Sequence, residues 1–177
     1  MKEQAENNPK TQRPIRGRNQ RNDRTDKEKD PFVENVLQID RVSRTVKGGR
    51  RIRFRALVVV GDRAGKVGVA LGKANEVSSA VSKASSKARK NLKTITIVND
   101  SISLPVTSRY GSATVLLKPA PSGTSIIAGG AVRAVVEAAG IKNLVSKILG
   151  SGNKCNNAFA TLAALEEATK LTSRVRK

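Results

Sequence analysis

The residues with the clearest chemical potential are the arginines and lysines of one short segment. Seven of the 15 residues from 41 to 55 are basic and none is acidic. The arginine side chain is planar, and its donors match two oxygens of a phosphate at once. Two adjacent glycines let the backbone approach a phosphate closely. This pattern predicts the binding of a polyanion. The candidate residues are Arg41, Arg44, Lys47, Gly48, Gly49, Arg50, Arg51, Arg53 and Arg55.

The excess of positive charge extends along the chain beyond this segment. Residues 41–93 carry 15 basic and two acidic side chains, a net charge of +13 within a total of +20. A solvated surface normally mixes the two signs, so the near absence of acids favours contact with phosphates. Simple solvent exposure and contact with another protein are the alternatives. Further candidates for phosphate contact are Lys66, Lys73, Lys83, Lys87, Arg89 and Lys90.

The scarcity of aromatic residues narrows the kind of nucleic acid. Aromatic side chains make up 2% of the chain, which is too few for a platform on which single-stranded bases stack. Double-stranded and folded RNA is recognised mainly through its shape and backbone. Folded RNA is therefore the predicted partner.

The composition also excludes several classes of enzyme. The chain has no His and a single Cys, Cys155. This removes Ser-His and Cys-His nucleophile pairs, His metal ligands and an intrachain disulfide. No apolar run approaches the roughly 20 residues that span a bilayer, and no secretory signal is evident. We expect no catalytic residue, metal, cofactor, small-molecule substrate or membrane, and a cytoplasmic location.

The elements expected to position the basic residues are three strands of an antiparallel meander. In the second strand, apolar side chains alternate with Arg51, Arg53 and Arg55. Because strand side chains alternate between faces, this predicts one core face, beginning at Ile52, and one face that carries a row of arginines. The predicted strands cover residues 33–46, 51–60 and 67–71, with turns at 47–50 and 61–65.

A helix is expected after the meander, over residues 76–92. Apolar residues recur there at three- and four-residue spacing, the pattern of a helix packed on a sheet. Lys83, Lys87 and Lys90 lie on a different face of this helix. No acidic residue follows Glu76 within it, so we interpret this face as a second phosphate contact.

The second half of the chain predicts a mixture of strands and helices. Strands are expected over 94–98, 101–106, 110–118 and 141–148, a helix over 128–139 ended by Gly140, and a last helix from 155 or 156 to 170. The whole chain is then divided into four parts. These are a disordered polar extension over 1–31, a domain over 32–95, a domain over 96–171 and a basic tail over 172–177.

The segment of residues 119–130 is rich in Gly and Ser and precedes a predicted helix, as a nucleotide phosphate loop would. It weakly resembles the loop of small-molecule kinases of the galactokinase and homoserine kinase superfamily. However, it lacks Gly-x-x-x-x-Gly-Lys, and no carboxylate cluster for magnesium is evident. Close helix packing, or contact with RNA or protein, explains the glycines better than catalysis does.

Three motifs in order carry a resemblance to a known family. They are the stretch from Gly49 to Ala70 with Glu76 to Ala80, the stretch from Ser122 to Arg133, and Gly150-Ser-x-Asn153. Residues 41–50 are similar to the family's basic loop. Over about residues 33–170, the chain resembles the bacterial small-subunit ribosomal protein S-five family.

The resemblance implies an α+β fold with two small domains. The first is a meander plus helix similar to a double-stranded-RNA-binding domain, and the second is the α+β fold that the family shares with a domain of the translocation GTPase and with the small-molecule kinases. It also implies a non-enzymatic ribosomal protein, because a shared fold does not carry activity.

The resemblance also implies partners and sites. The partners are 16S ribosomal RNA near the decoding region, messenger RNA where it enters the subunit, and ribosomal proteins S-four and S-eight. Residues Ser43, Val46, Lys47, Gly48 and Gly49 would lie near the spectinomycin site on the RNA. Gly123, Ser125 and Arg133 would lie at the boundary with protein S-four.

The sequence departs from the family pattern at three places. Ser125 stands where the family usually has a glycine, residues 107–111 replace a stretch that usually contains Gly and His, and residues 1–30 extend beyond the match. Two other readings compete with a ribosomal protein: a free-standing RNA chaperone or regulator, and a phosphotransferase built on the second domain.

Overall fold

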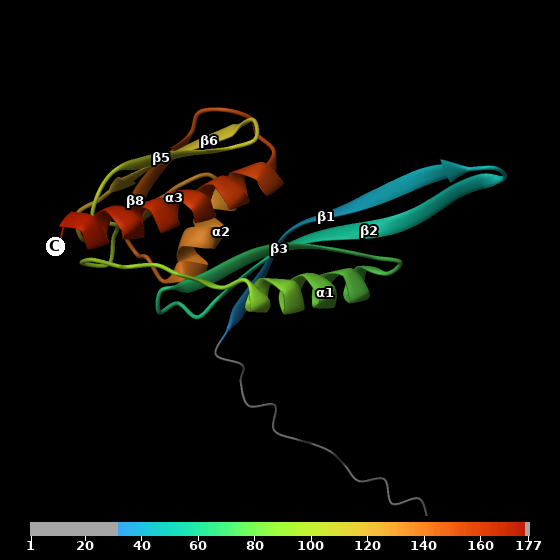
Figure 1. Cartoon of the computed structure of the whole chain (residues 1–177), viewed down its shortest axis with the longest axis horizontal. Coiled ribbons are helices and arrows are strands. Elements are labelled where there is room, and N and C mark those ends of the chain that lie inside the picture. The colour runs from blue at the N-terminus through green and yellow to red at the C-terminus, as the bar shows by residue number, and fades with distance from the viewer. Residues whose placement is uncertain (1–31, 176–177) are drawn as a thin grey trace, which may run out of the picture.

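A computed structural model describes residues 32–175. The predicted disordered extension, and the last two residues of the predicted tail, lie outside this range. The described chain folds into two four-stranded sheets and three helices (Figure 1). The predicted α+β fold is confirmed. The expected division into domains stays a prediction.

The first sheet is the predicted meander with one short strand added. Its strands are antiparallel and lie in chain order. The two long strands continue past the rest of the sheet as a hairpin that projects from the body (Figure 1). The strands are β1 (Val33–Val46), β2 (Gly49–Gly61), β3 (Lys66–Ala74) and β4 (Lys93–Thr94).

Helix α1 (Val77–Lys90) packs on one face of this sheet through the predicted stripe of small residues. Ala80, Ala84 and Ala88 are fully buried against it. The fit needs glycine on β3, because a Cβ at Gly72 would lie 2.3 Å from the carbonyl oxygen of Ala80. Helix and sheet are thus held at backbone contact.

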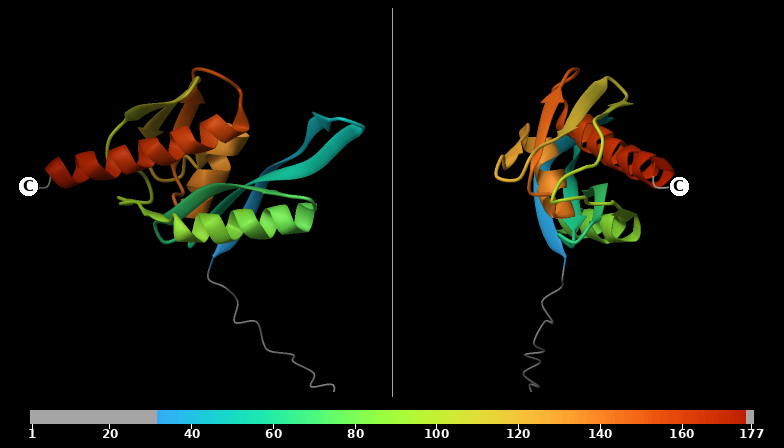
Figure 2. Two further views of the ribbon diagram at one scale, coloured as in Figure 1. Left: turned by 45° about the vertical axis from the view of Figure 1, so that its right-hand side comes forward. Right: turned by 90° about the vertical axis from the view of Figure 1, so that its left-hand side faces the viewer.

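The opposite face of the first sheet packs against the second half of the chain. A single core joins Leu57 and Val59 of β2 to Val132 and Val135 of α2 (Gly130–Ala139). Helix α2 therefore lies between the two sheets, and α3 (Lys154–Val175) packs beside it (Figures 1 and 2). The second sheet has the order β5-β6-β8-β7. Its strands are β5 (Val106–Tyr110), β6 (Ala113–Pro119), β7 (Ile126–Ile127) and β8 (Leu144–Ile148).

Several predicted elements of the second half are wrong in their bounds. Residues 101–105 are not a strand, because Pro105 has no N–H for a ladder; β5 begins at Val106. The predicted strand over 110–118 is instead interrupted by a turn at Gly111, which has a φ of +58°.

The last helix continues to Val175, so residues 172–175 are helical rather than a tail. Its extension is explained by Thr172, which is buried and whose hydroxyl contacts both Ala168 and Ser103.

Candidate RNA-binding surface

The register of the hairpin decides which basic side chains share a face. Arg44 lies opposite Arg51, Val42 opposite Arg53, and Asp40 opposite Arg55. Strand β3 extends this face, since Lys73 lies opposite Arg55 on the other side of β2. The face therefore gathers Arg44, Arg51, Arg53 and Lys73 around one cavity of about 250 Å³.

Helix α1 packs on the other face of the sheet, but it brings one more cation close to Arg53 and Lys73. A second cavity, of about 570 Å³, is lined by Arg53 and Lys73 from the sheet and by Lys83 from the helix, and the carboxylate residue Glu76 also lines it. We call the five residues Arg44, Arg51, Arg53, Lys73 and Lys83 the arginine face. Among residues 32–175, none of the five has an ion-pair partner. Their charge is therefore available to an external anion.

Arg55 was predicted to belong to this row, but its charge is neutralised by Asp40. Its Nη2 lies 2.6 Å from Asp40 Oδ2 and its Nε 3.1 Å from the same oxygen. The pKa of Asp40 lies below its usual value because of hydrogen bonds from Arg55 and then Gln38, with the charge of Lys154 adding to the effect. The guanidinium is committed to the protein, so it is not a free phosphate ligand.

Arg89 is also held within the protein. Its Nη2 lies 3.0 Å from Glu34 Oε1, and its guanidinium carbon lies 5.8 Å from the ring centroid of Phe32. The other oxygen of Glu34 accepts a 2.7 Å hydrogen bond from Ser85. The prediction that no acid balances this helix overlooked Glu34, which comes from β1.

The remaining predicted contacts lie elsewhere on the molecule. Arg41 and Arg50 are exposed on the face of the hairpin opposite the arginine face, and Lys87 and Lys90 are exposed farther along α1. Lys66 is at the other end of β3 from Lys73, about 23 Å away at 3.3 Å per residue. The structure does not bring these residues into the arginine face.

The predicted core face of the hairpin ends earlier than expected. Ala56 and Val58 are fully buried under α1, but Ile52 is 39% exposed. The hairpin extends beyond the end of the helix (Figure 1), so nothing among the described residues covers its outer part. Both faces of that part are therefore accessible.

The tip of the hairpin has the glycine geometry that its sequence predicts. Gly48 has a φ of +93° and Gly49 a φ of +151°, and an added Cβ at either would meet no atom within 4 Å. Ser43, Val46 and Lys47 are exposed beside it. The tip is thus open to an external partner.

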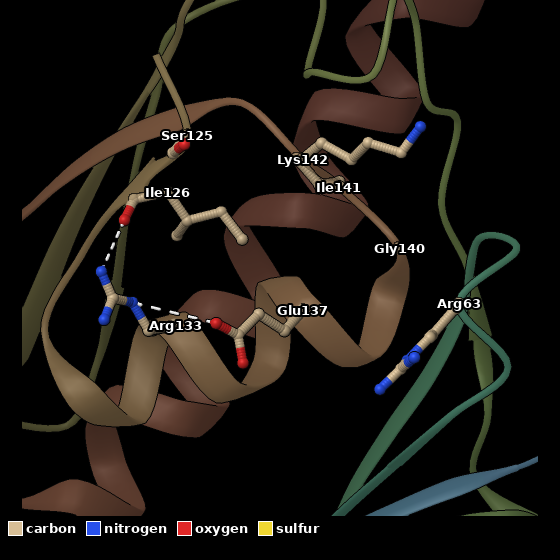
Figure 3. A pocket seen from close by; sticks show the side chains of 8 residues that line it. All are labelled: Arg63, Ser125, Ile126, Arg133, Glu137, Gly140, Ile141 and Lys142. Atoms are coloured by element: carbon tan, nitrogen blue, oxygen red, sulfur yellow. Dashed lines mark hydrogen bonds and ion pairs between the residues drawn. The ribbon is translucent and has the colours of Figure 1, made fainter. Parts of the chain in front are cut away.

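The three residues expected at a protein boundary form a second surface. The side-chain Oδ1 of Asn143 accepts hydrogen bonds from the backbone N–H groups of Gly123 and Ser125, at 3.2 and 3.1 Å. Arg133 donates to the carbonyl oxygen of Ile126 at 2.7 Å. Ser125, Arg133 and Arg63 line one cavity of about 520 Å³ (Figure 3).

Sequence reasoning missed the residues that hold these side chains. Asp40 and Glu34 of β1 neutralise Arg55 of β2 and Arg89 of α1. The signal available was that both are acids in the strand paired with the basic one. Asn143 fixes the loop of Ser125 from 18 residues away. No local sequence pattern predicts that contact.

Residues 32–175 contain no group of three His, Cys, Asp or Glu side chains that could hold a metal ion. Within the same range, no helix is long and apolar enough to cross a membrane.

The described residues thus form an α+β fold with an exposed group of unpaired cations, a combination typical of nucleic-acid-binding proteins. Two family models match: "Ribosomal protein S5, N-terminal domain" over residues 32–96 and "Ribosomal protein S5, C-terminal domain" over residues 108–176. The chain belongs to this family, uS5, which is a family of non-enzymatic proteins of the ribosome.

Individual relatives cover most of the chain. Small ribosomal subunit protein uS5 of Xanthomonas campestris pv. campestris is 47% identical over 156 residues, which are 88% of this chain and 87% of the relative. The protein of the same name from Syntrophobacter fumaroxidans is 50% identical over 134 residues, which are 76% of this chain and 81% of the relative. Small ribosomal subunit protein uS5c of Spinacia oleracea is 51% identical over 143 residues, which are 80% of this chain and 46% of the relative.

Proposed function

We propose that this chain is a structural protein of the small ribosomal subunit that binds folded 16S ribosomal RNA through the arginine face. One observation carries this proposal. Five cations from three strands and a helix line two cavities that share Arg53 and Lys73, and no acid of the described chain pairs with any of them. Such a surface binds the RNA backbone and fixes its position.

The rigidity of the hairpin supports backbone recognition. Strands β1 and β2 are paired from Val33 to Gly61, with one irregularity between Val36 and Gln38. The arginines are therefore presented at fixed spacing, so little conformational entropy is lost when each meets a phosphate. If all five cations contact phosphates, log K against log salt has a slope of about −4.

The location within the subunit is a further part of the proposal, based on the family resemblance. The hairpin tip, with Ser43, Val46, Lys47, Gly48 and Gly49, faces RNA beside the spectinomycin site near the decoding region. The protein also lies beside messenger RNA where it enters, and next to ribosomal proteins S-four and S-eight. This placement is supported by the open tip, which meets no other part of the described chain.

The second surface is proposed as the boundary with protein S-four. Gly123, Ser125 and Arg133 lie close together because Asn143 and Ile126 hold their loop and helix. The surface combines exposed backbone with the cations Arg63 and Arg133 and one acid, Glu137, whose Oε1 lies 3.9 Å from Arg133 Nε (Figure 3). A protein partner with carboxylates on its surface fits these groups.

The test of RNA binding uses two triple variants of the full chain. Changing Arg44, Arg51 and Arg53 to Gln should weaken binding to 16S ribosomal RNA and make the salt slope shallower by about 2 to 3. The matched control removes the same charge from exposed lysines of the second half. It changes Lys118, Lys147 and Lys170 to Gln.

The outcomes of this test separate the proposal from its competitors. Equal loss of affinity in both variants would mean that net charge, and not the arginine face, binds the RNA. Sedimentation adds a second criterion: the wild-type protein should cofractionate with small subunits in moderate salt. RNA binding without such cofractionation would favour a free-standing RNA chaperone.

A further inference from the structure

A cavity of about 390 Å³ lies where the N-termini of two helices meet. Gly130 and Ala131, at the start of α2, line one side of it. Gly152, Lys154 and Asn157, from the start of α3 and the loop before it, line the other. The cavity is remote from the hairpin tip and was not predicted as a site.

The chemistry of these two N-termini favours an anion. The first N–H groups of a helix have no partner within it, and α2 has no side-chain cap. In α3, Asn153 Oδ1 accepts a 3.0 Å hydrogen bond from the N–H of Cys155, so the open donors are those of α2. Neither helix carries an acidic residue in its first turn, and α3 places Lys154 there, against the positive end of its own dipole. A Cβ at Gly130 or Gly152 would meet nothing within 4 Å, so the backbone is open.

A buried side chain at the same cavity has an unused acceptor. Asn157 is 1% exposed, and its Nδ2 donates a 3.0 Å hydrogen bond to the carbonyl oxygen of Ser151. Among the described residues, its Oδ1 has no hydrogen-bond partner. A buried acceptor without a donor lowers the stability of the folded protein. The site thus supplies donors and a cation for an anion, and an acceptor for a hydroxyl.

The cavity also continues the basic surface of the hairpin. The Arg55–Asp40 pair follows Arg53 along the same face of β2, and the ammonium of Lys154 is close enough to help lower the pKa of Asp40. Figure 1 shows the N-terminal end of α3 next to the base of the hairpin. The sugar–phosphate backbone of a single RNA strand can therefore run along the arginine face and into the cavity.

We propose that this cavity binds one ribose–phosphate unit of RNA, with Gly130, Ala131 and Lys154 on the phosphate and Asn157 on the 2′-hydroxyl. The backbone N–H groups of α2 and the ammonium of Lys154 donate to the phosphate oxygens, and the 2′-hydroxyl donates to Asn157 Oδ1. RNA alone among nucleic acids carries that hydroxyl beside each phosphate. This site rests on the proposed RNA binding and adds a contact made by the second half of the chain.

The first test changes Gly130 to Asp in the full chain. An acid in the first turn stabilises a helix by interacting with its dipole, so the free protein should resist urea at least as well as the wild type. The same carboxylate repels a phosphate, so affinity for 16S ribosomal RNA should fall by about 3- to 10-fold. A substitution that keeps or raises the free energy of unfolding but lowers RNA affinity would not be explained by a purely structural role of Gly130.

The second test uses a matched pair of lysines on α3. Lys154→Gln should weaken RNA binding and make the salt slope shallower by about 0.7 to 0.9. Lys170→Gln removes the same charge from an exposed position 16 residues farther along the helix, and should leave the slope nearly unchanged. Equal effects of the two substitutions would overturn the site.

The remaining outcomes keep this site separate from the arginine face. If the triple arginine variant loses RNA affinity while Gly130→Asp and Lys154→Gln do not, the cavity is not an RNA site and the proposed function stands. If ATP stabilises the wild-type protein without RNA, and Gly130→Asp abolishes this, the ligand is a nucleotide and the RNA assignment is overturned.

Discussion

Gly61 lies directly against the carbonyl oxygen of Ala138: a Cβ at Gly61 would be 2.1 Å from that oxygen. The same oxygen accepts a 3.0 Å hydrogen bond from the N–H of Arg63, and the carbonyl of Ala139 accepts a 2.9 Å bond from Gly65. The turn after β2 therefore caps the C-terminus of α2, whose last carbonyls have no partner within the helix. This contact fixes the hairpin relative to the second sheet.

Gly61→Ala is expected to destabilise the protein strongly. The new methyl group cannot fit against a backbone oxygen, so either the turn or α2 must move, at a cost of about 1–3 kcal/mol. Urea unfolding gives the free energy directly. Gly152→Ala is the control, because a Cβ there meets nothing within 4 Å. A stability equal to wild type in Gly61→Ala would contradict this close contact.

Local pattern predicted the first half of the fold well. Alternation in β2 and the alanine spacing of α1 each reflect a face that must be buried, so both could be recognised before the structure. The bounds of β5 and β6 were missed because a turn at Gly111 and Ser112 divides what looked like one apolar run.

The site was predictable in its residue types but not in its partners. The basic residues were evident, whereas the neutralisation of Arg55 depends on a carboxylate 15 residues away in the chain. That pairing follows from the register of β1 on β2, which is constant from Val46 opposite Gly49 to Gln38 opposite Leu57 and changes only at the bulge beyond them. The register is set by the turn at Lys47 and Gly48, whereas the pattern of the basic strand, taken alone, does not reveal its partner.

The Asp40–Arg55 pair should make stability depend on pH in the acid range. The pKa of Asp40 is lower in the folded protein than its usual 3.8, so its contribution is present above about pH 4 and is lost as pH falls through the folded pKa. Because both side chains are partly exposed, the contribution stays below about 1 kcal/mol. Urea unfolding at pH 7 and pH 3 should show a smaller difference for Asp40→Asn than for wild type. An unchanged difference would mean that the pair is not formed in solution.

Ser125→Gly is expected to stabilise the protein. Ser125 has a φ of +62°, a left-handed conformation in which a residue with a Cβ is strained by about 1–2 kcal/mol. Glycine adopts this conformation without strain, so the strain comes from the Cβ of the serine. Removing the Cβ should raise the free energy of unfolding by about 1 kcal/mol, less the added entropy of the unfolded glycine. Thermal unfolding measures it, and a lower melting temperature would show that the Ser125 hydroxyl contributes more than its strain costs.

Gly49→Asp tests the proposed position of the hairpin tip on the ribosomal RNA. The fold should survive, because the tip is exposed and a Cβ at Gly49 meets nothing within 4 Å, although its φ of +151° strains any other residue by about 1–2 kcal/mol. The carboxylate would repel RNA phosphate and displace the loop. If the tip borders the spectinomycin site, the RNA helix that forms the drug pocket can then shift, and inhibition by the drug should weaken without direct contact between drug and protein. The measurement is spectinomycin inhibition of translation by small subunits reconstituted with the wild-type or variant protein, with incorporation verified by sedimentation. Unchanged inhibition by subunits that contain the variant would contradict this position of the tip.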